Sequence, residues 1–377
     1  MKLLDACEFI IDCPHSTAKD EGFGYPLIRT PNIGKGRLIL EGVHRVSENV
    51  YNQRNARGTP EENDLIFARE APAGNVAIIK SGQKVCLGQR TVLIRPNTDI
   101  VDPDFLTYFL LAPQQQYGLL GTANGSTVAH VNLPTIRNLE ISLPDLPIQK
   151  HIGAILSAYD DLIENNQKQI KLLEEAAQRL YKEWFVDLRF PGWETAEIVD
   201  GVPVGWRKEA IGNLLEKITR TKQVMTAEYM KKGIIPIIDQ SKDFIAGYTN
   251  IIETIVDIGK PVIVFGDHTR ILKFIQFPFA KGADGTQLIV SNDDCMPQSL
   301  FYCSLINVDL SNYHYARHFK YLKAEEILVP NKEIAESFDS FAAPIFNQMQ
   351  KLRDKSVFCA EARDRLLPKL MSGELEV

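Results

Sequence analysis

Hydrogen-bonding side chains gather in the turn-like segments between the expected strands, in both halves of this chain. An Arg guanidinium matches the edge of guanine, an Asn or Gln amide matches adenine, and Lys, Ser and Thr suit phosphates. In the segment NYHYARH, aromatic and basic residues stand together, as they commonly do at nucleic-acid surfaces. These clusters predict surfaces that read DNA. The candidate DNA-binding residues are Arg29, Asn32, Lys35, Arg54, Arg57, Arg69, Gln89, Arg90, Asn124, Ser126, Thr127, His130, Asp267, His268, Thr269, Arg270, Lys281, Asp284, Thr286, Tyr313, Tyr315, Arg317 and His318.

The overall charge opposes this interpretation. The net charge of the chain is −6, whereas phosphate neutralisation normally needs a basic surface. Either DNA is not the partner, or other subunits supply much of the positive charge. Each candidate taken alone could also be an ordinary solvated loop residue.

Signatures of catalysis are missing from the sequence. It contains no P-loop, no motif of an adenine methyltransferase, no GxSxG elbow and no HExxH. Asp267 and His268 could form a catalytic pair, but no nucleophile or second carboxylate is near them in sequence. The six cysteines lack CxxC spacing, so we expect reduced thiols and no metal site. The sequence therefore indicates a recognition protein.

No stretch of the sequence suggests a membrane protein. Acidic residues interrupt the apolar residues of the first thirteen positions, and no apolar run elsewhere is long enough to span a bilayer. We therefore expect a cytoplasmic protein.

Two long helical segments, at 148–185 and about 331–370, must position these loops. Their apolar residues recur at alternating steps of three and four, which is the heptad pattern of a coiled coil. Ala342 and Leu370 in the second seam lie 186 residues after Leu156 and Trp184 in the first, so the two helices share one register without a gap. The predicted helix-pairing seam is Leu156, Tyr159, Ile163, Asn166, Ile170, Leu173, Leu180, Trp184, Ile345, Met349, Leu352, Cys359, Leu366 and Leu370.

The blocks before the helices repeat as well. DLIFAREAPAGNVAIIKSGQKVCLGQRTVLIRP and KPVIVFGDHTRILKFIQFPFAKGADGTQLIVSN both read strand, turn, strand, glycine-bearing turn, strand. A two-fold relation between the repeats would make the helices antiparallel; the alternative is that each helix simply packs on its own domain. The predicted fold is α+β, with a pseudo-two-fold internal repeat. Its predicted parts are a first strand-rich domain at 1–147, a central helix and linker at 148–190, a second strand-rich domain at 191–330 and a final helix at 331–377.

Two local features sharpen this expectation. Asp102 and Pro103 form the start signal of a short helix over Pro103–Leu111. Pro344 falls inside the second long segment, where proline costs about 3 kcal/mol. We expect a kink or a helix start there.

At this point the chain resembles the specificity subunit of a type I restriction-modification system, over nearly its full length. In the first half the resemblance is carried by PLIRTPNIGKGRL, DLIFAREAPAGNVAII, VCLGQRTVLIRP and GSTVAHVNLPTIRNLEISLP. In the second half it is carried by VPVGWR, VFGDHTR, PFAKGADGTQLI, YARHFKYLK and RDRLLPKLMSGELEV. The chain departs from the family's pattern at Asn63, where glycine is usual, at Ile148, where glutamate is usual, and at Pro344.

The resemblance implies two target-recognition domains separated by antiparallel helices. Each domain would read one half of an asymmetric, split site in double-stranded DNA, and the helices would set the spacer and dock two modification subunits. Restriction subunits would add translocation and cleavage. The chain would hold no cofactor, because S-adenosylmethionine, ATP and Mg²⁺ would belong to partners. These modification subunits would also clamp the DNA, so this chain need not be basic.

Three other interpretations stay open from the sequence. The chain could be a coiled-coil scaffold with two domains that do not bind DNA, or an orphan or inactive specificity paralogue. It could also be an enzyme sufficient in itself, against which the missing cofactor motifs argue.

Overall fold

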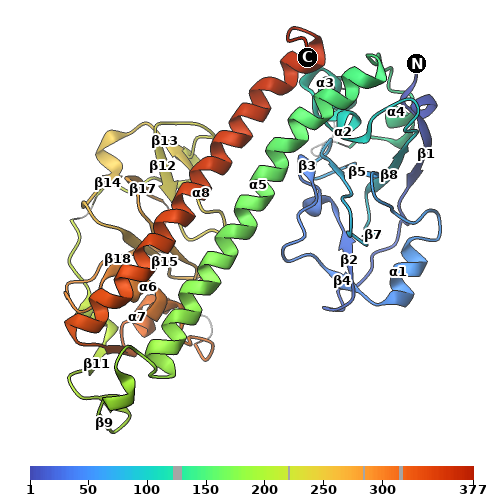
Figure 1. Cartoon of the computed structure of the whole chain (residues 1–377). Coiled ribbons are helices and arrows are strands. Elements are labelled where there is room, and N and C mark those ends of the chain that lie inside the picture. Colours follow the sequence, from blue (N-terminus) through green and yellow to red (C-terminus); the bar gives the residue numbers. More distant parts are fainter. Residues whose placement is uncertain (122–129, 220, 283–284, 314–316) are drawn as a thin grey trace. The chain divides into compact units, whose positions relative to one another are not determined.

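The computed structural model describes residues 1–121, 130–219, 221–282, 285–313 and 317–377. It divides into two compact units, each of which contains part of both long helices (Figure 1). Unit 1 is Met1–Asn166 with Lys355–Val377, and unit 2 is Gln167–Asp354. In the described ranges, no helix is long and apolar enough to cross a membrane.

Unit 1 is built on two small sheets. The larger has the order β1-β8-β5-β6-β3 and the smaller β4-β2-β7. The side chains of β5 and β6 are fully buried, because both faces of the larger sheet are covered by core clusters. Its strands are β1 (Cys7–Asp12), β2 (Tyr25–Ile28), β3 (Gly36–Arg37), β4 (Arg45–Val46), β5 (Leu65–Ala68), β6 (Val76–Ile78), β7 (Cys86–Leu87) and β8 (Thr91–Pro96), and its short helices are α1 (Glu48–Arg54), α2 (Pro103–Leu111), α3 (Pro113–Leu120) and α4 (Leu133–Arg137).

Unit 2 has a four-stranded sheet β13-β12-β17-β14, a three-stranded sheet β16-β15-β18, and the pairs β11-β19 and β10-β9. Its strands are β9 (Ile198–Val199), β10 (Val202–Pro203), β11 (Arg207–Ala210), β12 (Ile235–Ile238), β13 (Gly247–Thr249), β14 (Ile255–Val256), β15 (Val262–Gly266), β16 (Leu272–Ile275), β17 (Phe279–Lys281), β18 (Thr286–Ile289) and β19 (Glu326–Val329), and its short helices are α6 (Gln298–Ile306) and α7 (His318–Leu322).

Strand pairing repeats between the units, as the sequence predicts. In unit 1, β2 pairs antiparallel with β4 and parallel with β7, and β5 lies between β6 and β8. In unit 2, β12 pairs antiparallel with β13 and parallel with β17, and β15 lies between β16 and β18. The α+β fold with an internal repeat is therefore confirmed.

Two local sequence signals are visible in the structure of unit 1. The predicted helix Pro103–Leu111 is confirmed as α2, and the Asp102 carboxylate accepts the N–H of Phe105 at 2.9 Å as its N-cap. Asn63, which stands where the family usually has glycine, has a φ of 72°. Asparagine tolerates this left-handed conformation better than most residues, so the turn before β5 survives the replacement.

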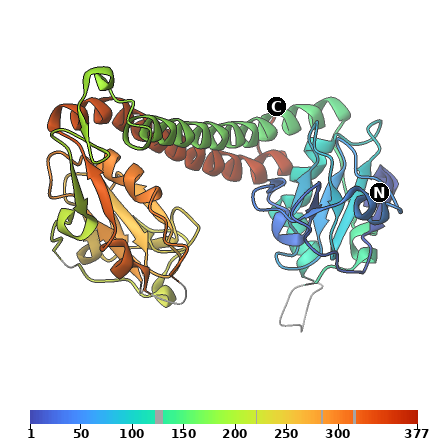
Figure 2. The ribbon, with the colours of Figure 1, turned by 90° about the horizontal axis from the view of Figure 1, so that it is seen from below.

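The long helices lie close to the predicted ranges 148–185 and about 331–370. α5 covers Leu146–Tyr181 and continues into a π-helical turn at Lys182–Val186, and α8 covers Lys332–Ser372. The two helices run side by side (Figure 2). In unit 1, Asn166 donates to Ser356 Oγ at 3.2 Å, and Asp160 pairs with Arg363. Since the earlier residue of α5 meets the later residue of α8, the helices are antiparallel there.

Every residue of the predicted seam is buried or half-buried. In unit 2, Leu173 and Leu180 of α5 pack in the same hydrophobic cluster as Met349 of α8. In unit 1, Leu156 and Leu370 share a cluster with the core of the strand-rich domain. The helices therefore pair with each other and also pack on the domains, so the two alternatives left open by the sequence coexist.

Of the kink or helix start expected at Pro344, the helix start is wrong, because α8 begins at Lys332 and continues through the proline. Pro344 itself is exposed, so water can satisfy the carbonyl left without its helical N–H. Buried Phe338, Ala342 and Phe346 flank it. Burial of such side chains stabilises the helix by about 1.5–3 kcal/mol per large residue, which offsets the cost of the proline.

Candidate nucleic-acid interface

A chain of polar contacts links four segments of unit 1. Arg69, just after β5, donates to Asp12 Oδ2 at 2.7 Å and lies 3.0 Å from His130 Nε2. His130 Nδ1 lies 2.6 Å from Glu70, whose other oxygen pairs with Arg90 at 2.8 Å. With Arg69 donating to Nε2, the imidazole must donate from Nδ1 to Glu70. The structure thus brings three predicted residues together, and adds Asp12 and Glu70, which the sequence analysis missed.

Arg90 is the outward end of this chain of contacts. Its side chain is 62% exposed, and its φ of 64° places it in a left-handed turn between β7 and β8. The Glu70 side chain is 19% exposed, whereas its Arg90 partner is largely in solvent, which screens the attraction between them. The Arg90 guanidinium can therefore turn from Glu70 to a phosphate or a base. Glu70 holds Arg90 and His130 in one place.

Other predicted residues of unit 1 serve the fold. Arg54 is only 5% exposed and donates to the carbonyls of Pro14, Ser16 and Leu87, and burial lowers its pKa. Asn32 is 6% exposed and bonds backbone groups on both sides of its turn. Gln89 donates to the carbonyl of His15 at 2.9 Å. Contacts of these three side chains with DNA stay predictions.

The remaining predicted residues of unit 1 differ in exposure. Lys35 and Arg57 are exposed, and Arg57 reaches the carbonyl of Cys13 at 3.4 Å. Arg29 is half-buried beside β2. Asn124, Ser126 and Thr127 lie outside the described residues.

Unit 2 contains a related arrangement. Arg270, in the turn after β15, donates from Nε to His318 Nε2 at 3.2 Å and from Nη2 to the carbonyl of Tyr313 at 2.8 Å. Tyr313 stacks on Tyr321 with ring centroids 4.1 Å apart. His318 is 4% exposed, and burial together with the Arg270 charge lowers its pKa. Each unit thus joins an arginine after its central strand to a histidine beside a short helix.

Asp267 has a structural task in this arrangement. Its carboxylate accepts the N–H of Phe319 at 2.8 Å and its carbonyl accepts the N–H of His318 at 2.9 Å, so it caps α7. The sequence leaves Asp267 and His268 open as a catalytic pair. In the structure, the carboxylate of Asp267 is engaged as the cap of α7. His268 and Thr269 are exposed.

Gln240, which the sequence analysis did not single out, stabilises the same turn. Gln240 accepts the N–H of His268 through Oε1 and the hydroxyl of Thr269 through its carbonyl. The segment that contains Gln240 is held in turn by Lys273, which is 4% exposed and donates to the carbonyls of Asp239 and Asp243. A buried lysine with two carbonyl partners is a signal that only tertiary structure reveals.

The other predicted residues of unit 2 are dispersed. Arg317 is exposed, Lys281 is half-buried and Thr286 is 1% exposed. Asp284 and Tyr315 lie outside the described residues.

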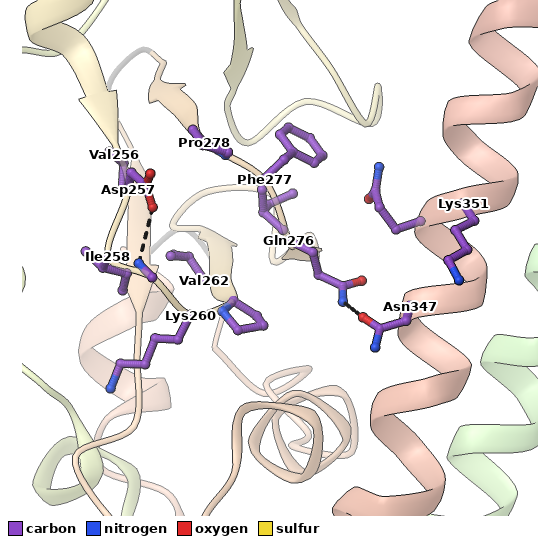
Figure 3. Close-up of a pocket in the computed structure, with 14 residues that line it drawn as sticks. Val256, Asp257, Ile258, Lys260, Val262, Gln276, Phe277, Pro278, Asn347 and Lys351 are labelled. Atoms are coloured by element: carbon purple, nitrogen blue, oxygen red, sulfur yellow. Dashed lines mark hydrogen bonds between the residues drawn. The ribbon is translucent and has the colours of Figure 1, made fainter.

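A groove lined by both polar and apolar side chains lies beside α8 in unit 2 (Figure 3). Its volume is about 590 Å³, and it is lined by the segment before β15, the turn between β16 and β17, and one face of α8. Gln276 donates to Asn347 of α8 across it at 2.5 Å. Lys260 and Lys351 contribute the positive charges of its lining.

Metal chemistry finds no support in the described ranges. There, no three His, Cys, Asp or Glu side chains come together as a metal site, and all six cysteines are free thiols. Burial raises the pKa of Cys7 and Cys86 to about 12, so these two thiols are not reactive thiolates.

Comparisons with known proteins agree on one family. Residues 5–175 match the model of the type I restriction modification DNA specificity domain. The chain is 26% identical to the type I restriction enzyme MjaIX specificity subunit of Methanocaldococcus jannaschii, with 90% of this chain and 83% of that protein covered. It is 27% identical to the putative MjaX specificity subunit of the same organism, covering 71% of this chain and 64% of that protein.

A solved structure has the same fold. The crystal structure of the type I restriction-modification S subunit from M. genitalium superposes with a TM-score of 0.55 at 14% identity, over 98% of this chain and 95% of that one. The first half of this chain therefore matches the type I restriction modification DNA specificity domain, and the chain is similar over most of its length to specificity subunits of type I restriction enzymes.

Proposed function

We propose that this chain is the DNA-recognition subunit of a type I restriction-modification complex and is not catalytic by itself. Each strand-rich domain reads one half of a split, asymmetric site. The observation that carries the proposal is the arginine–histidine pair at the end of the central strand of both units, Arg69 with His130 and Arg270 with His318. A doubled reading element suits a ligand in two parts.

The chemistry of the complex belongs to partner subunits in this proposal. Two modification subunits bind S-adenosylmethionine and methylate an adenine in each half-site, and restriction subunits use ATP and Mg²⁺. The modification subunits dock on α5 and α8, whose length sets the spacer. Leu172 of α5 is 63% and Phe358 of α8 69% exposed, and a docked subunit would cover these apolar side chains.

The acidic charge of the chain is compatible with this division of labour. With a net charge of −6, the chain alone supplies little of the phosphate neutralisation that dominates affinity for DNA. Base contacts specify sequence while phosphate contacts supply affinity. A reader can therefore be acidic overall if its partners clamp the DNA.

The experiment that tests the proposal is a methylome. The chain is co-expressed with the modification subunit of its own system, and methylated adenines are mapped by single-molecule sequencing. We expect one split motif with an adenine modified in each half. Absence of methylation from a complex that is intact by size exclusion would favour the scaffold or an inactive paralogue.

A further inference from the structure

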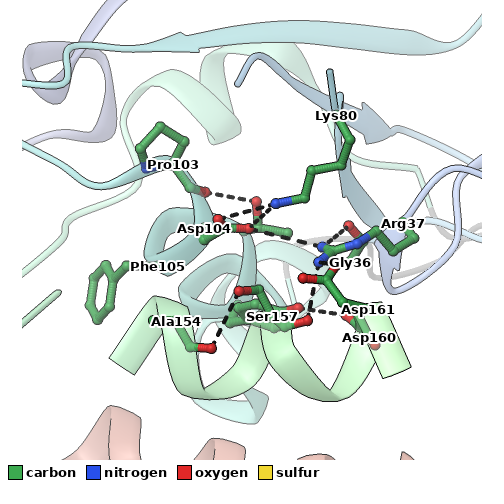
Figure 4. A network of polar contacts seen from close by, with 12 residues as sticks. Gly36, Arg37, Lys80, Pro103, Asp104, Phe105, Ala154, Ser157, Asp160 and Asp161 are labelled. Carbon is green, nitrogen blue, oxygen red and sulfur yellow. Dashed lines mark hydrogen bonds and ion pairs between the residues drawn. The ribbon is translucent and has the colours of Figure 1, made fainter. Parts of the chain in front are cut away.

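A buried carboxylate of α5, that of Asp160, contacts both the strand-rich domain of unit 1 and the opposite helix. Asp160 is 4% exposed and lies next to Asp161, which pairs with Arg37 of the domain (Figure 4). Asp160 Oδ2 accepts the hydroxyl of Tyr108 from α2 at 2.5 Å, and its Oδ1 pairs with the guanidinium of Arg363 from α8. One side chain thus joins three elements.

Strand β3 approaches the same carboxylate closely. A Cβ added to Gly36, whose φ is 98°, would lie 2.4 Å from Asp160 Oδ2, so only glycine permits the contact. The next residue, Arg37, donates to the carbonyl of Ser157 at 3.2 Å and to Asp161 at 2.7 Å. The backbone and a guanidinium of the domain are therefore both fixed to adjacent turns of α5.

Further charges complete this Asp160 network. Asp104 of α2 pairs with Lys80 at 2.8 Å and lies 3.9 Å from Arg37. Only 13% of the Arg37 side chain and 12% of the Arg363 side chain are exposed. Removal of the Asp160 charge would leave the Arg363 guanidinium with only the exposed carboxylate of Asp364 as its partner, which destabilises the arrangement.

The internal repeat is broken at this junction. The positions 186 residues away from Asp160 and Arg363 are occupied by Phe346 and Ala177. Phe346 is 2% exposed and packs on Phe274 with ring centroids 4.6 Å apart. In unit 2 aromatic packing takes the place of the buried ion pair.

A hydroxyl–carboxylate bond is nevertheless present in unit 2. Tyr302 of α6 donates to Glu174 of α5 at 3.2 Å. Tyr302 also packs on Phe346 with ring centroids 5.4 Å apart. In unit 2 the hydroxyl–carboxylate bond therefore accompanies aromatic packing instead of a buried ion pair. Tyr302 is for this reason a matched control for Tyr108.

We propose that the Asp160 network is a positioning device, which fixes the strand-rich domain of unit 1 on its own stretch of α5 and α8 and thereby restricts the complex to one spacer length. The inference rests on the proposed function. Charge-assisted hydrogen bonds are directional, so they allow only one position of the domain on the helices. Apolar packing alone is non-directional and does not impose this restriction. Asp160, Tyr108, Arg37 and Gly36 are positioning residues and need not touch a base.

The test uses Tyr108→Phe and Asp160→Asn in the complete chain, co-expressed with the modification subunits. The methylome of each variant is compared with that of the wild type. We expect the half-site bases to stay the same. Methylation at sites with a spacer one base pair longer or shorter should rise about tenfold, which corresponds to about 1.4 kcal/mol.

Two controls accompany these variants. Tyr302→Phe removes the corresponding hydroxyl in unit 2, and Asp364→Asn removes a 59% exposed carboxylate that pairs with Arg363 but leaves the bonds of Asp160 in place. Both should keep the wild-type spacer. An equal relaxation in Tyr302→Phe would overturn the special role of the Asp160 network.

The remaining outcomes are also decisive. An unchanged spacer in an intact complex overturns the proposal. A uniform loss of methylation at all sites, in step with a lower melting temperature, shows a merely structural role and overturns it too. If Asp160→Asn does not assemble, Tyr108→Phe decides, because it keeps the carboxylate–guanidinium pair. A wild-type chain that directs no methylation would instead contradict the proposed function itself.

Discussion

Among the predicted reading residues, burial and partners divide side chains of the same type. Arg54 is 5% exposed with its donors on backbone carbonyls, whereas the side chain of Arg90 is 62% exposed and holds a single carboxylate. Both are arginines in turn-rich sequence, so their chemistry alone could not separate them. Arg270 lies between these extremes, because it holds His318 and stays half-buried.

Arg270→Ala should damage recognition of one half-site only. The guanidinium positions His318 and reaches the carbonyl of Tyr313, and both partners belong to unit 2. We expect a loss of about 1–3 kcal/mol in discrimination at that half-site, measured by methylation of half-site variants. Arg69→Ala is the matched change and should affect the other half. Equal losses at both halves would contradict the assignment.

The stability of unit 2 should fall in mild acid. Burial and Arg270 lower the pKa of His318 in the folded state, so below the unfolded pKa of about 6.5 the unfolded chain binds the proton more readily. The contribution of His318 to stability is therefore full above that pKa and is lost as the pH falls towards the folded value. Thermal unfolding from about pH 7 to about pH 5 measures this loss. His318→Asn should flatten the dependence, and an equally steep dependence in that variant would assign it to other groups.

At the scale of elements, tertiary packing outweighs local propensity in α8. Pro344 predicts an interruption, yet the flanking side chains are buried and the helix continues. The start of α2 shows the opposite case, since its cap and proline act within a few residues and the predicted boundaries hold. Local signals therefore determine helix ends where no core opposes them.

The helices are the proposed ruler for the spacer. Insertion of four residues after Ile170 lengthens α5 by about 6 Å. Because Asn166 meets Ser356 and the helices are antiparallel, the facing turn of α8 is at Leu352, and a matched insertion there keeps the pair aligned. We expect an altered spacer with the same half-site sequences in the methylome. An active complex that keeps the original spacer would contradict the proposal that the helix length sets the spacer.

At the scale of the whole molecule, a chain of net charge −6 is proposed to bind a polyanion only with the help of partners. The slope of log affinity against log salt reports the number of phosphates neutralised. We expect a shallow slope for the isolated chain and a much steeper one for its complex with the modification subunits, measured by DNA binding over a range of salt concentrations. A chain that is equally salt-dependent alone would show that its own basic residues dominate affinity.

The sequence by itself determined the repeat, the two long helices in one register and the strand-rich blocks before them, because periodicity and turn signals act over short distances along the chain. It also singled out Arg69, Arg90 and His130, which the structure brings together in unit 1, and Arg270 and His318, which the structure brings together in unit 2. Only the tertiary structure decided that Arg54 and Asp267 serve the fold, that Gln240 and Lys273 brace a turn, and that Asp160 joins three elements. These roles depend on partners 28 to 203 residues away in sequence. Burial and pairing between such distant residues are set by packing, which no local pattern encodes.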